Sequence, residues 1–331
     1  MRNHWVEFTA KESVVLQNAD VDLALKPGQV LVRGEVSVIS PGTELAVLQD
    51  RFLPRPHLQG KPPRYPVTPG YAMVGEVVET ADDRVKVGER LLVGKRHSLY
   101  NVLDVHRVTQ WCRVPEGMAS SDAALGSLAQ IALTAPLSID VRFGHRVLVI
   151  GLGIIGYLAA QWFRNTSALE VCGCDLRKDR TAFAAARGVG VVTASEAGRA
   201  GPYDIVVEAT GAIEAVRDAF GFVREGGAVL LLGTSREKLD DFDIANAIHR
   251  KLVTVVGTHV NRHDRAVVVG PPVPTQNTRE LAVRYIHAGK ICVEGLVGRV
   301  FPAEQAPQAY IAIESEKLYT VELDWTRLGP S

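Results

Sequence analysis

Apolar and polar residues alternate in the first part of the chain, in the pattern of strands that bury one face. The clearest cases are residues 29–38 and 72–79, because every second side chain of a strand points to the same side of a sheet. Pairs such as Pro41-Gly42 and Pro69-Gly70 interrupt the pattern and mark turns. Residues 1–120 are therefore predicted to form a mostly β domain with irregular loops.

From residue 121 onward, short apolar runs alternate with amphipathic segments. An Ala- and Leu-rich segment at 121–139 predicts a helix, with Ser121 as its candidate cap. After it, strands are predicted at 146–150, 169–174, 204–207, 228–232 and 253–256, and helices at 154–165, 178–187, 213–223 and 243–250. Strands that alternate with helices form a parallel sheet with helices on both faces, so the pattern predicts an α/β fold.

The regular alternation ends near residue 257. A loop is predicted at 271–274, a helix at 278–287, a loop and a helix at 301–313, and a strand at 319–323. This tail is too short to form a domain of its own. We therefore expect residues 261–331 to fold back and complete the first domain.

A glycine-rich turn follows the first strand of the alternating region. Gly151, Gly153 and Gly156 have the spacing G-x-G-x-x-G, with Ile154 and Ile155 between them, and a helix pattern follows. Such a turn lets the backbone approach the pyrophosphate of a dinucleotide, whose charge is met by the N–H groups at the start of the helix. Residues 121–260 are therefore predicted to form a doubly wound Rossmann domain, and these five residues are candidate cofactor contacts.

An acidic residue, Asp175, stands where the second strand ends. A carboxylate at this position can bond to the adenosine ribose and would repel a 2′-phosphate, so NAD is favoured over NADP. Arg177 and Lys178 keep NADP open as an alternative, because a cation there could accept that phosphate. Leu176 and Arg180 are further candidate cofactor contacts.

Three later loops also follow strands of the same predicted sheet. They contain Thr210 and Gly211, then Gly233 and Thr234, and finally His259. Ligands of such sheets bind at the carboxyl ends of the strands. These five residues are therefore candidate cofactor contacts as well, with an ordinary strand–loop junction as the alternative for the first two loops.

Composition excludes several classes of function. The chain has 331 residues, of which 37 are basic and 37 acidic, so no net field attracts nucleic acid or an anionic membrane. Its four scattered cysteines form no disulfide framework, and its first residues lack the pattern of a signal peptide. Residues 147–163 carry no charge, but glycines interrupt them, so a strand and a helix explain them better than a membrane span. We expect a cytoplasmic protein.

These motifs, in this order, resemble the medium-chain dehydrogenase/reductase superfamily over nearly the whole chain. The resemblance implies a GroES-like β-rich catalytic domain before the Rossmann domain. Residues 39–44 and 65–71 are also similar to loops of bacteriochlorophyllide (hydroxyethyl side chain) dehydrogenases, which oxidise a secondary alcohol to a ketone. The matching segments are 40–44 (SPGTE), 69–71 (PGY), 87–90 (VGER), the glycine turn, 208–211 (EATG) and 301–306 (FPAEQA).

Zinc-dependent members of this superfamily carry a cysteine, a histidine and a third ligand at three positions. The aligned residues here are Pro41, Tyr71 and Gly126, and Ala72 replaces the glutamate after the histidine. Proline and glycine have no ligating side chain, and a neutral tyrosine is a poor zinc ligand. Residues 92–105 contain no cysteine, so the four-cysteine structural zinc lobe is missing too. The resemblance therefore implies a catalytic domain without zinc.

Without a metal, side chains must meet the charge that develops on the substrate oxygen during hydride transfer. Thr43 lies where the family has its proton-relay hydroxyl, with a turn-capping role as the alternative. Tyr71 could donate its phenol to the substrate or only line the pocket. His97 can shuttle protons near neutral pH, or it is a surface or structural histidine. Glu44 could anchor the Thr43 loop or accept a hydrogen bond from a polar substrate.

The sequence thus favours a zinc-independent, NAD-dependent dehydrogenase that interconverts a secondary alcohol and a ketone. A cyclitol, a sugar derivative or a natural-product intermediate would fit as its small-molecule substrate. An NADPH-dependent enoyl or quinone reductase is the alternative within the superfamily, and a non-catalytic nucleotide-binding protein is the alternative outside it. By analogy with the family, we expect a homodimer.

Overall fold

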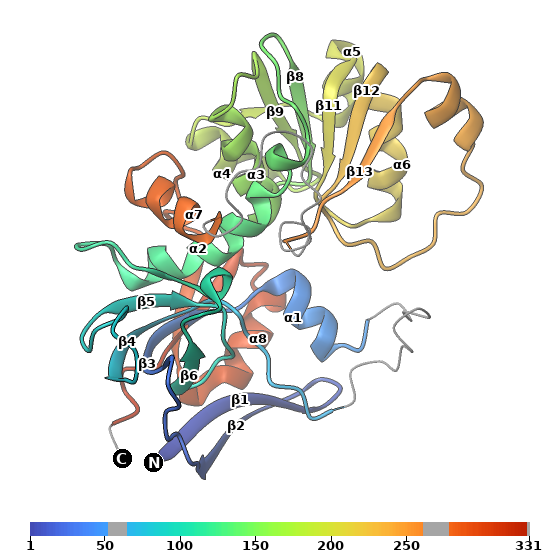
Figure 1. Ribbon diagram of the computed structural model, residues 1–331. Coiled ribbons are helices and arrows are strands. Elements are labelled where there is room, and N and C mark those ends of the chain that lie inside the picture. Colours follow the sequence, from blue (N-terminus) through green and yellow to red (C-terminus); the bar gives the residue numbers. More distant parts are fainter. Residues whose placement is uncertain (52–64, 261–277, 330–331) are drawn as a thin grey trace. The chain divides into compact units, whose positions relative to one another are not determined.

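A computed structural model describes residues 1–51, 65–260 and 278–329 (Figure 1). The chain forms two compact units. Unit 1 consists of Met1–Leu128, Gln276–Gly289 and Val293–Ser331, and unit 2 consists of Ala129–Thr275 and Lys290–Cys292. The predicted α/β fold class is confirmed, because unit 2 holds a parallel sheet with helices and unit 1 is rich in strands.

Unit 1 is built around a mixed β-sheet. In its described residues the strands lie in the order β14-β15-β3-β4-β5-β7, and β6 also pairs with β3. A separate hairpin joins β1 and β2 in antiparallel register. The strands predicted at 29–38 and 72–79 are β3 and β4, and the last predicted strand is β15. The bounds are β1 (Arg2–Ala10), β2 (Ser13–Asp20), β3 (Gln29–Val38), β4 (Met73–Thr80), β5 (Arg90–Val93), β6 (Tyr100–Asp104), β7 (Trp111–Arg113), β14 (Val297–Pro302) and β15 (Thr320–Asp324).

Three helices of unit 1 are α1 (Pro41–Leu48), α7 (Thr278–His287) and α8 (Ala306–Ser315). The prediction of a loop around Thr43 is wrong, because this residue lies in α1. Proline is favourable in the first turn of a helix, where its missing N–H costs nothing. The Glu44 side chain also accepts the N–H of Ser40, the residue before the helix, at 2.8 Å.

Helix α2 (Ser120–Leu133) begins one residue before the predicted cap, so the capping role of Ser121 is wrong. A short 3-10 helix (Pro136–Ser138) follows it, which accounts for the predicted extent to residue 139. Near the other end of the chain, α8 packs on the apolar core of unit 1. Tyr310 of α8 meets Phe8 edge to face, with ring centroids 5.1 Å apart.

Unit 2 contains the parallel sheet that the alternating pattern predicted. Its strand order in the described residues is β10-β9-β8-β11-β12-β13. Helix α5 was missed, although Thr193 and Glu196 form a capping box at its start. The bounds are β8 (Arg146–Ile150), α3 (Ile154–Arg164), β9 (Glu170–Cys174), α4 (Lys178–Ala186), β10 (Gly190–Val191), α5 (Ala194–Ala200), β11 (Tyr203–Glu208), α6 (Ile213–Phe222), β12 (Val223–Leu231), a π-helix (Ala245–Arg250) and β13 (Thr254–Gly257).

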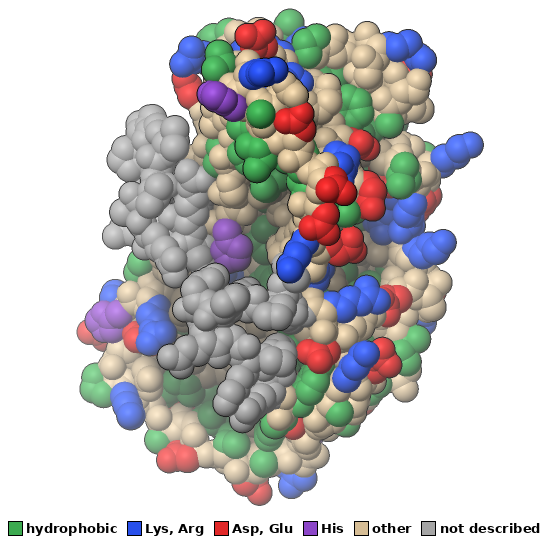
Figure 2. Space-filling model, turned by 90° about the vertical axis from the view of Figure 1, so that its right-hand side faces the viewer, with side chains coloured by type: hydrophobic (Ala, Val, Ile, Leu, Met, Phe, Trp, Pro, Cys, Tyr) green, Lys and Arg blue, Asp and Glu red, His purple; other side chains and the backbone are tan. Residues whose placement is uncertain are grey.

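No helix within the described ranges has the length and apolar character needed to cross a bilayer. The uncharged stretch at 147–163 instead forms β8, the glycine turn and most of α3. On the face drawn in Figure 2, basic and acidic side chains are interspersed. That distribution agrees with the equal numbers of the two charges in the chain. The predicted loop at 271–274 lies outside the described residues.

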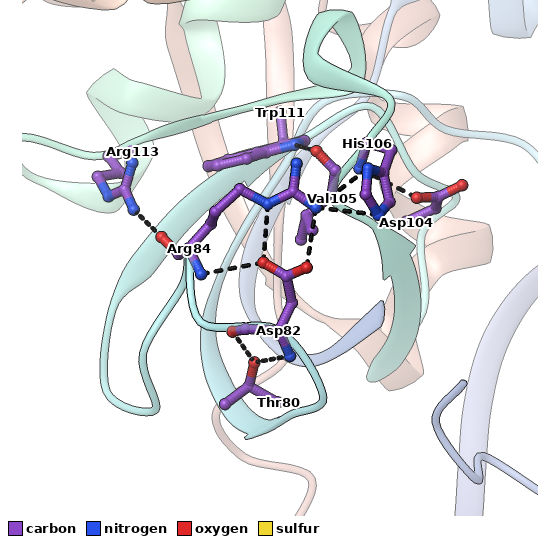
Figure 3. Close-up of polar contacts among 8 residues, drawn as sticks. All are labelled: Thr80, Asp82, Arg84, Asp104, Val105, His106, Trp111 and Arg113. Atoms are coloured by element: carbon purple, nitrogen blue, oxygen red, sulfur yellow. Dashed lines mark hydrogen bonds and ion pairs between the residues drawn. The ribbon is translucent and has the colours of Figure 1, made fainter. Parts of the chain in front are cut away.

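A polar cluster at the surface holds the connection between β4 and β5 (Figure 3). Arg84 makes two bonds of 2.8 Å to the carboxylate of Asp82, and these bonds lower the pKa of Asp82 well below its usual range. The Arg84 guanidinium also lies 3.0 Å from the ring of His106. The backbone oxygen of Arg84 accepts a hydrogen bond from the Arg113 side chain of β7. Such exposed pairs fix a turn but add little to stability.

Candidate functional site

The glycine turn closes the carboxyl end of β8 in unit 2. Gly151 has a φ of +92°, and a Cβ there would lie 2.4 Å from Cγ2 of Thr210. A Cβ on Gly156 would lie 1.8 Å from the oxygen of Gly151. Both positions therefore require glycine. Gly153 differs, because nothing lies within 4 Å of its Cβ position and it caps α3. This leaves open space in front of the helix N-terminus, where a phosphate is favoured.

Asp175 lies beside this turn and is held by two backbone donors. Its Oδ2 accepts the N–H of Leu152 at 2.7 Å, and its Oδ1 accepts the N–H of Arg177 at 2.8 Å. Each carboxylate oxygen keeps a further lone pair, so both can still accept a ribose hydroxyl. Leu176 is 99% exposed, whereas Arg180 is buried. Asp175 and Leu176 are thus available to a ligand. The burial of Arg180 indicates a structural role for this residue.

The loops after β11 and β12 interlock around a buried carboxyl group. Oε1 of Glu208 accepts the N–H groups of Thr210 and Gly211 at 2.6 and 2.9 Å. Its Oε2 has no partner within the described residues and lies 2.7 Å from where a Cβ on Gly233 would be. A Cβ on Gly211, which has a φ of +75°, would lie 2.7 Å from the oxygen of Thr234. Close backbone approach therefore fixes both loops next to the glycine turn.

The remaining predicted cofactor contacts are Ile154, Ile155 and His259. Ile154 is buried at the start of α3, and Ile155 is half-buried. His259 is exposed, two residues beyond β13. The sequence prediction named the segment that contains Glu208 but gave that residue no role. Its signal was a charged residue directly after the apolar run 205–207.

A buried hydrogen-bond network in unit 1 contains two of the predicted catalytic residues. Nε1 of Trp325 donates to Oγ of Ser37 at 2.8 Å, and this Oγ lies 2.7 Å from Nδ1 of His97. Nε2 of His97 lies 2.9 Å from Oε2 of Glu44. An indole can only donate, so Ser37 Oγ accepts from Trp325 and can donate its own hydrogen to Nδ1. In that tautomer the ring proton sits on Nε2 and faces Glu44.

Glu44 is the point at which this network converges. Besides His97, the hydroxyl of Tyr310 donates to its Oε2 at 2.5 Å, and the N–H of Ser40 donates to its Oε1 at 2.8 Å. Burial, followed by the nearby Glu44 charge, raises the pKa of Tyr310 well above its usual value. His97 is 0% exposed and both of its ring nitrogens are engaged. As placed, His97 offers no surface to a substrate.

Tyr71 lies at the edge of the same network and is half-buried. Its phenol donates to Oγ of Ser40. Burial raises the pKa of Tyr71 to about 12, while hydrogen bonds to Ser40 and Thr43 and the nearby Arg279 oppose that rise. The structure therefore brings all four predicted catalytic residues into one neighbourhood. The sequence analysis missed the members that join them: Ser37, Ser40, Tyr310 and Trp325.

The residues at the family's zinc-ligand positions do not fit a zinc ion. Pro41 opens α1, and Gly126 lies within α2; neither has a ligating group. The Tyr71 phenol is bonded to Ser40. Within the described ranges, no three His, Cys, Asp or Glu side chains come together in a way that could hold a metal. All four cysteines are free thiols, and three of them are buried.

Comparison with known proteins gives partial matches. Residues 155–270 match the family described as zinc-binding dehydrogenase. The chain is 26% identical over 219 residues to "Probable D-xylulose reductase A" of Arthroderma otae, covering 62% of this chain and 57% of that protein. It is 23% identical over 193 residues to D-guloside 3-dehydrogenase of Shigella flexneri, covering 54% and 55%. The chain thus spans little more than half the length of these curated relatives.

Among solved structures, the fold is similar to that of L-idonate 5-dehydrogenase from Escherichia coli. The TM-score is 0.82 with 98% of both chains covered, at 15% identity, which shows a shared fold. Residues 155–270 thus resemble the zinc-binding dehydrogenase family, and the whole chain shares the fold of the solved dehydrogenase. The finer resemblance, to bacteriochlorophyllide dehydrogenases, stays a prediction.

Proposed function

We propose that this protein is a nicotinamide-dependent oxidoreductase that interconverts a secondary alcohol and a ketone on a polar metabolite such as a polyol or sugar derivative. The observation that carries the proposal is the arrangement at the carboxyl edge of the unit 2 sheet. An open helix N-terminus at Gly153 lies beside the fixed carboxylate of Asp175. The sugar and polyol names of the relatives support the substrate class.

NAD is the proposed cofactor. The two backbone N–H groups that hold Asp175 keep its carboxylate where it would accept a ribose hydroxyl and repel a 2′-phosphate. Leu176, exposed next to it, offers an apolar surface to the adenine ring. Gly153 leaves room for the pyrophosphate. When bound, NAD supplies the hydride acceptor for the carbinol carbon.

Proton transfer falls to Tyr71 and Thr43, with no zinc ion. The phenol of Tyr71 stays protonated at neutral pH, since its pKa is raised to about 12. In ketone reduction its single O–H turns from Ser40 to the substrate oxygen and stabilises the charge that develops there. Thr43, exposed on α1 and bonded to Tyr71, passes the proton to or from solvent. In alcohol oxidation the proton leaves the substrate hydroxyl by the same route.

His97 and Glu44 act as positioning residues in this proposal. Neither has open surface, and Glu44 holds Ser40 through its N–H while the Ser40 hydroxyl accepts from Tyr71. The network therefore orients the Tyr71 phenol through one serine. A homodimer is proposed as well, because β13 is the edge of the sheet among the described strands and its Val255 is 39% exposed.

Titration of the purified protein with NAD(H) and NADP(H) tests the core of the proposal. We expect saturable binding with NAD preferred by about tenfold or more, and turnover on a secondary-alcohol panel without added metal. Absence of saturable cofactor binding would refute the proposed oxidoreductase activity. Cofactor binding without turnover on any substrate would favour a non-catalytic nucleotide-binding protein. Strong NADPH preference would favour an enoyl or quinone reductase. Stoichiometric zinc whose removal abolishes activity would refute the metal-free mechanism.

A further inference from the structure

Arg279, in the first turn of α7, has a guanidinium without an acidic partner among the described residues. Its Nη1 donates to Oγ of Ser127 at 2.6 Å. Its Nε is shut off from solvent and makes no hydrogen bond, and Nη2 on the same edge has no partner in the described part of the chain either. The titratable groups that act on it are the Cys112 thiol and the Tyr71 phenol. One edge of the guanidinium is therefore unused.

An unpaired guanidinium in this position is costly. Arginine keeps its charge in proteins, and burying a charge without a counter-charge is unfavourable. The neighbours supply no counter-charge at neutral pH, because burial raises the pKa values of Tyr71 and Cys112 each to about 12. The Nε and Nη2 donors of an arginine lie in one plane and match the two oxygens of a carboxylate or a phosphate. The unused edge of Arg279 therefore suits an anion.

The unused edge lies beside the group that we assign to the chemistry. Ser127 accepts from Arg279 and donates to the backbone oxygen of Tyr71 at 3.3 Å, so one serine connects the two residues. Arg279 and Tyr71 are both half-buried, and each keeps some open surface. A Cβ on Gly94 would lie 3.1 Å from Nη2. A side chain at position 94 would therefore crowd Nη2, and glycine avoids that contact.

We propose that Arg279 binds an acidic group of the substrate, a carboxylate or a phosphate, through Nη2 and, once the side chain has turned to uncover it, through Nε. The inference deepens the proposed function and rests on it, since Tyr71 is taken as the proton donor to the same substrate. The substrate class is then narrowed from neutral polyols to hydroxy acids of the sugar-acid kind or to sugar phosphates. Arg279 becomes the residue that selects for the anion and presents the reacting hydroxyl to Tyr71.

The test compares ligands that differ only in the charged group. Binding of D-gluconate, D-glucitol 6-phosphate and D-glucitol is measured by calorimetry on the full chain, with and without NAD, for the native protein, Arg279→Gln and Arg284→Gln. Arg284 is a matched control, because it lies on the same helix with a side chain that is 73% exposed. We expect an acidic ligand to bind about tenfold or more tightly than D-glucitol. Arg279→Gln loses this preference and Arg284→Gln keeps it.

The tighter-binding ligand of the two, D-gluconate or D-glucitol 6-phosphate, shows whether Arg279 selects a carboxylate or a phosphate. Equal binding of charged and neutral ligands, or a preference that survives in Arg279→Gln, would overturn the proposal. Arg279→Lys, which keeps the charge, should retain part of the preference even if the glutamine variant folds poorly. NAD titration of the same proteins tests the proposed NAD-dependent function separately from the anion-binding role of Arg279. A native protein that binds NAD and oxidises only neutral polyols overturns the role of Arg279 and leaves the proposed function intact.

Discussion

Replacing Tyr310 with phenylalanine removes one donor from Glu44 and leaves the rest of the buried network in place. The hydroxyl donates to Oε2 of Glu44 at 2.5 Å, and the residue is 1% exposed. The ring keeps its edge contact with Phe8, at 5.1 Å and 81°, because only the hydroxyl is deleted. The change in unfolding free energy therefore reports the hydrogen bond rather than the packing.

The expected loss is about 2–3 kcal/mol, the upper part of the range for hydrogen bonds to charged groups, since the acceptor is a buried carboxylate. Tyr65→Phe is the matched control. The Tyr65 hydroxyl donates to the backbone oxygens of Val47 and Leu48 at 2.8 and 3.2 Å, which are neutral acceptors. Its loss should cost about 0.5–1.5 kcal/mol. The difference between the two variants combines the Glu44 charge with the deeper burial of Tyr310.

Urea unfolding followed by tryptophan fluorescence measures both variants. Trp325 takes part in the network of unit 1, and Trp162 lies in unit 2, so the transitions of the two units are fitted separately rather than as one. In both variants, only the unfolding transition of unit 1 should shift to a lower urea concentration. If Tyr310→Phe costs no more than Tyr65→Phe, Glu44 is not the point of convergence that the distances indicate, and the reasoning fails.

Three further predictions concern the proposed site. Gly151→Ala should abolish NAD binding and lower the stability of unit 2 by more than about 1 kcal/mol, because its φ is +92° and its Cβ would meet Thr210; unchanged NAD titration would contradict this. Asp175→Ala should weaken NAD and strengthen NADP, each by roughly tenfold, and parallel titrations check it. Tyrosinate absorbance of the native protein minus Tyr71→Phe should titrate near pH 12. Because the folded pKa exceeds the unfolded value, about 10, this group's stabilising contribution is lost as the pH rises above 10; a midpoint at the ordinary value would contradict it.

The cofactor edge was predictable because its signals are local in sequence. The three glycines of the turn lie within six residues, between a strand and a helix. The contacts that require two of them, Gly151 and Gly156, come from that turn and the loop at Thr210. Asp175 follows the next strand, at a spacing that parallel sheets impose. The backbone bond from Leu152 to Asp175 adds a detail that the spacing alone does not contain.

The network of unit 1 could not be predicted in the same way, because its bonds are long-range. Tyr310 lies 266 positions from Glu44, and Trp325 lies 288 positions from Ser37. No local pattern distinguishes such partners from other residues on a buried face. Helix α1 depends on the same bonds, since Glu44 satisfies Ser40 at its start. Arg279 was read only as part of a helix, because its lack of a counter-charge is visible only once its neighbours are known.

The predicted catalytic residues divide into an inner pair and an outer pair, and this division has a physical consequence. His97 and Glu44 are sealed in the interior, whereas Thr43 is exposed and Tyr71 is half-buried. Ser40 joins the pairs, because its N–H binds Glu44 and its hydroxyl accepts from Tyr71. Since desolvated polar groups are costly to leave unpaired, a change in the inner pair acts on stability first. Such a change alters the position of the Tyr71 phenol only if it displaces Ser40.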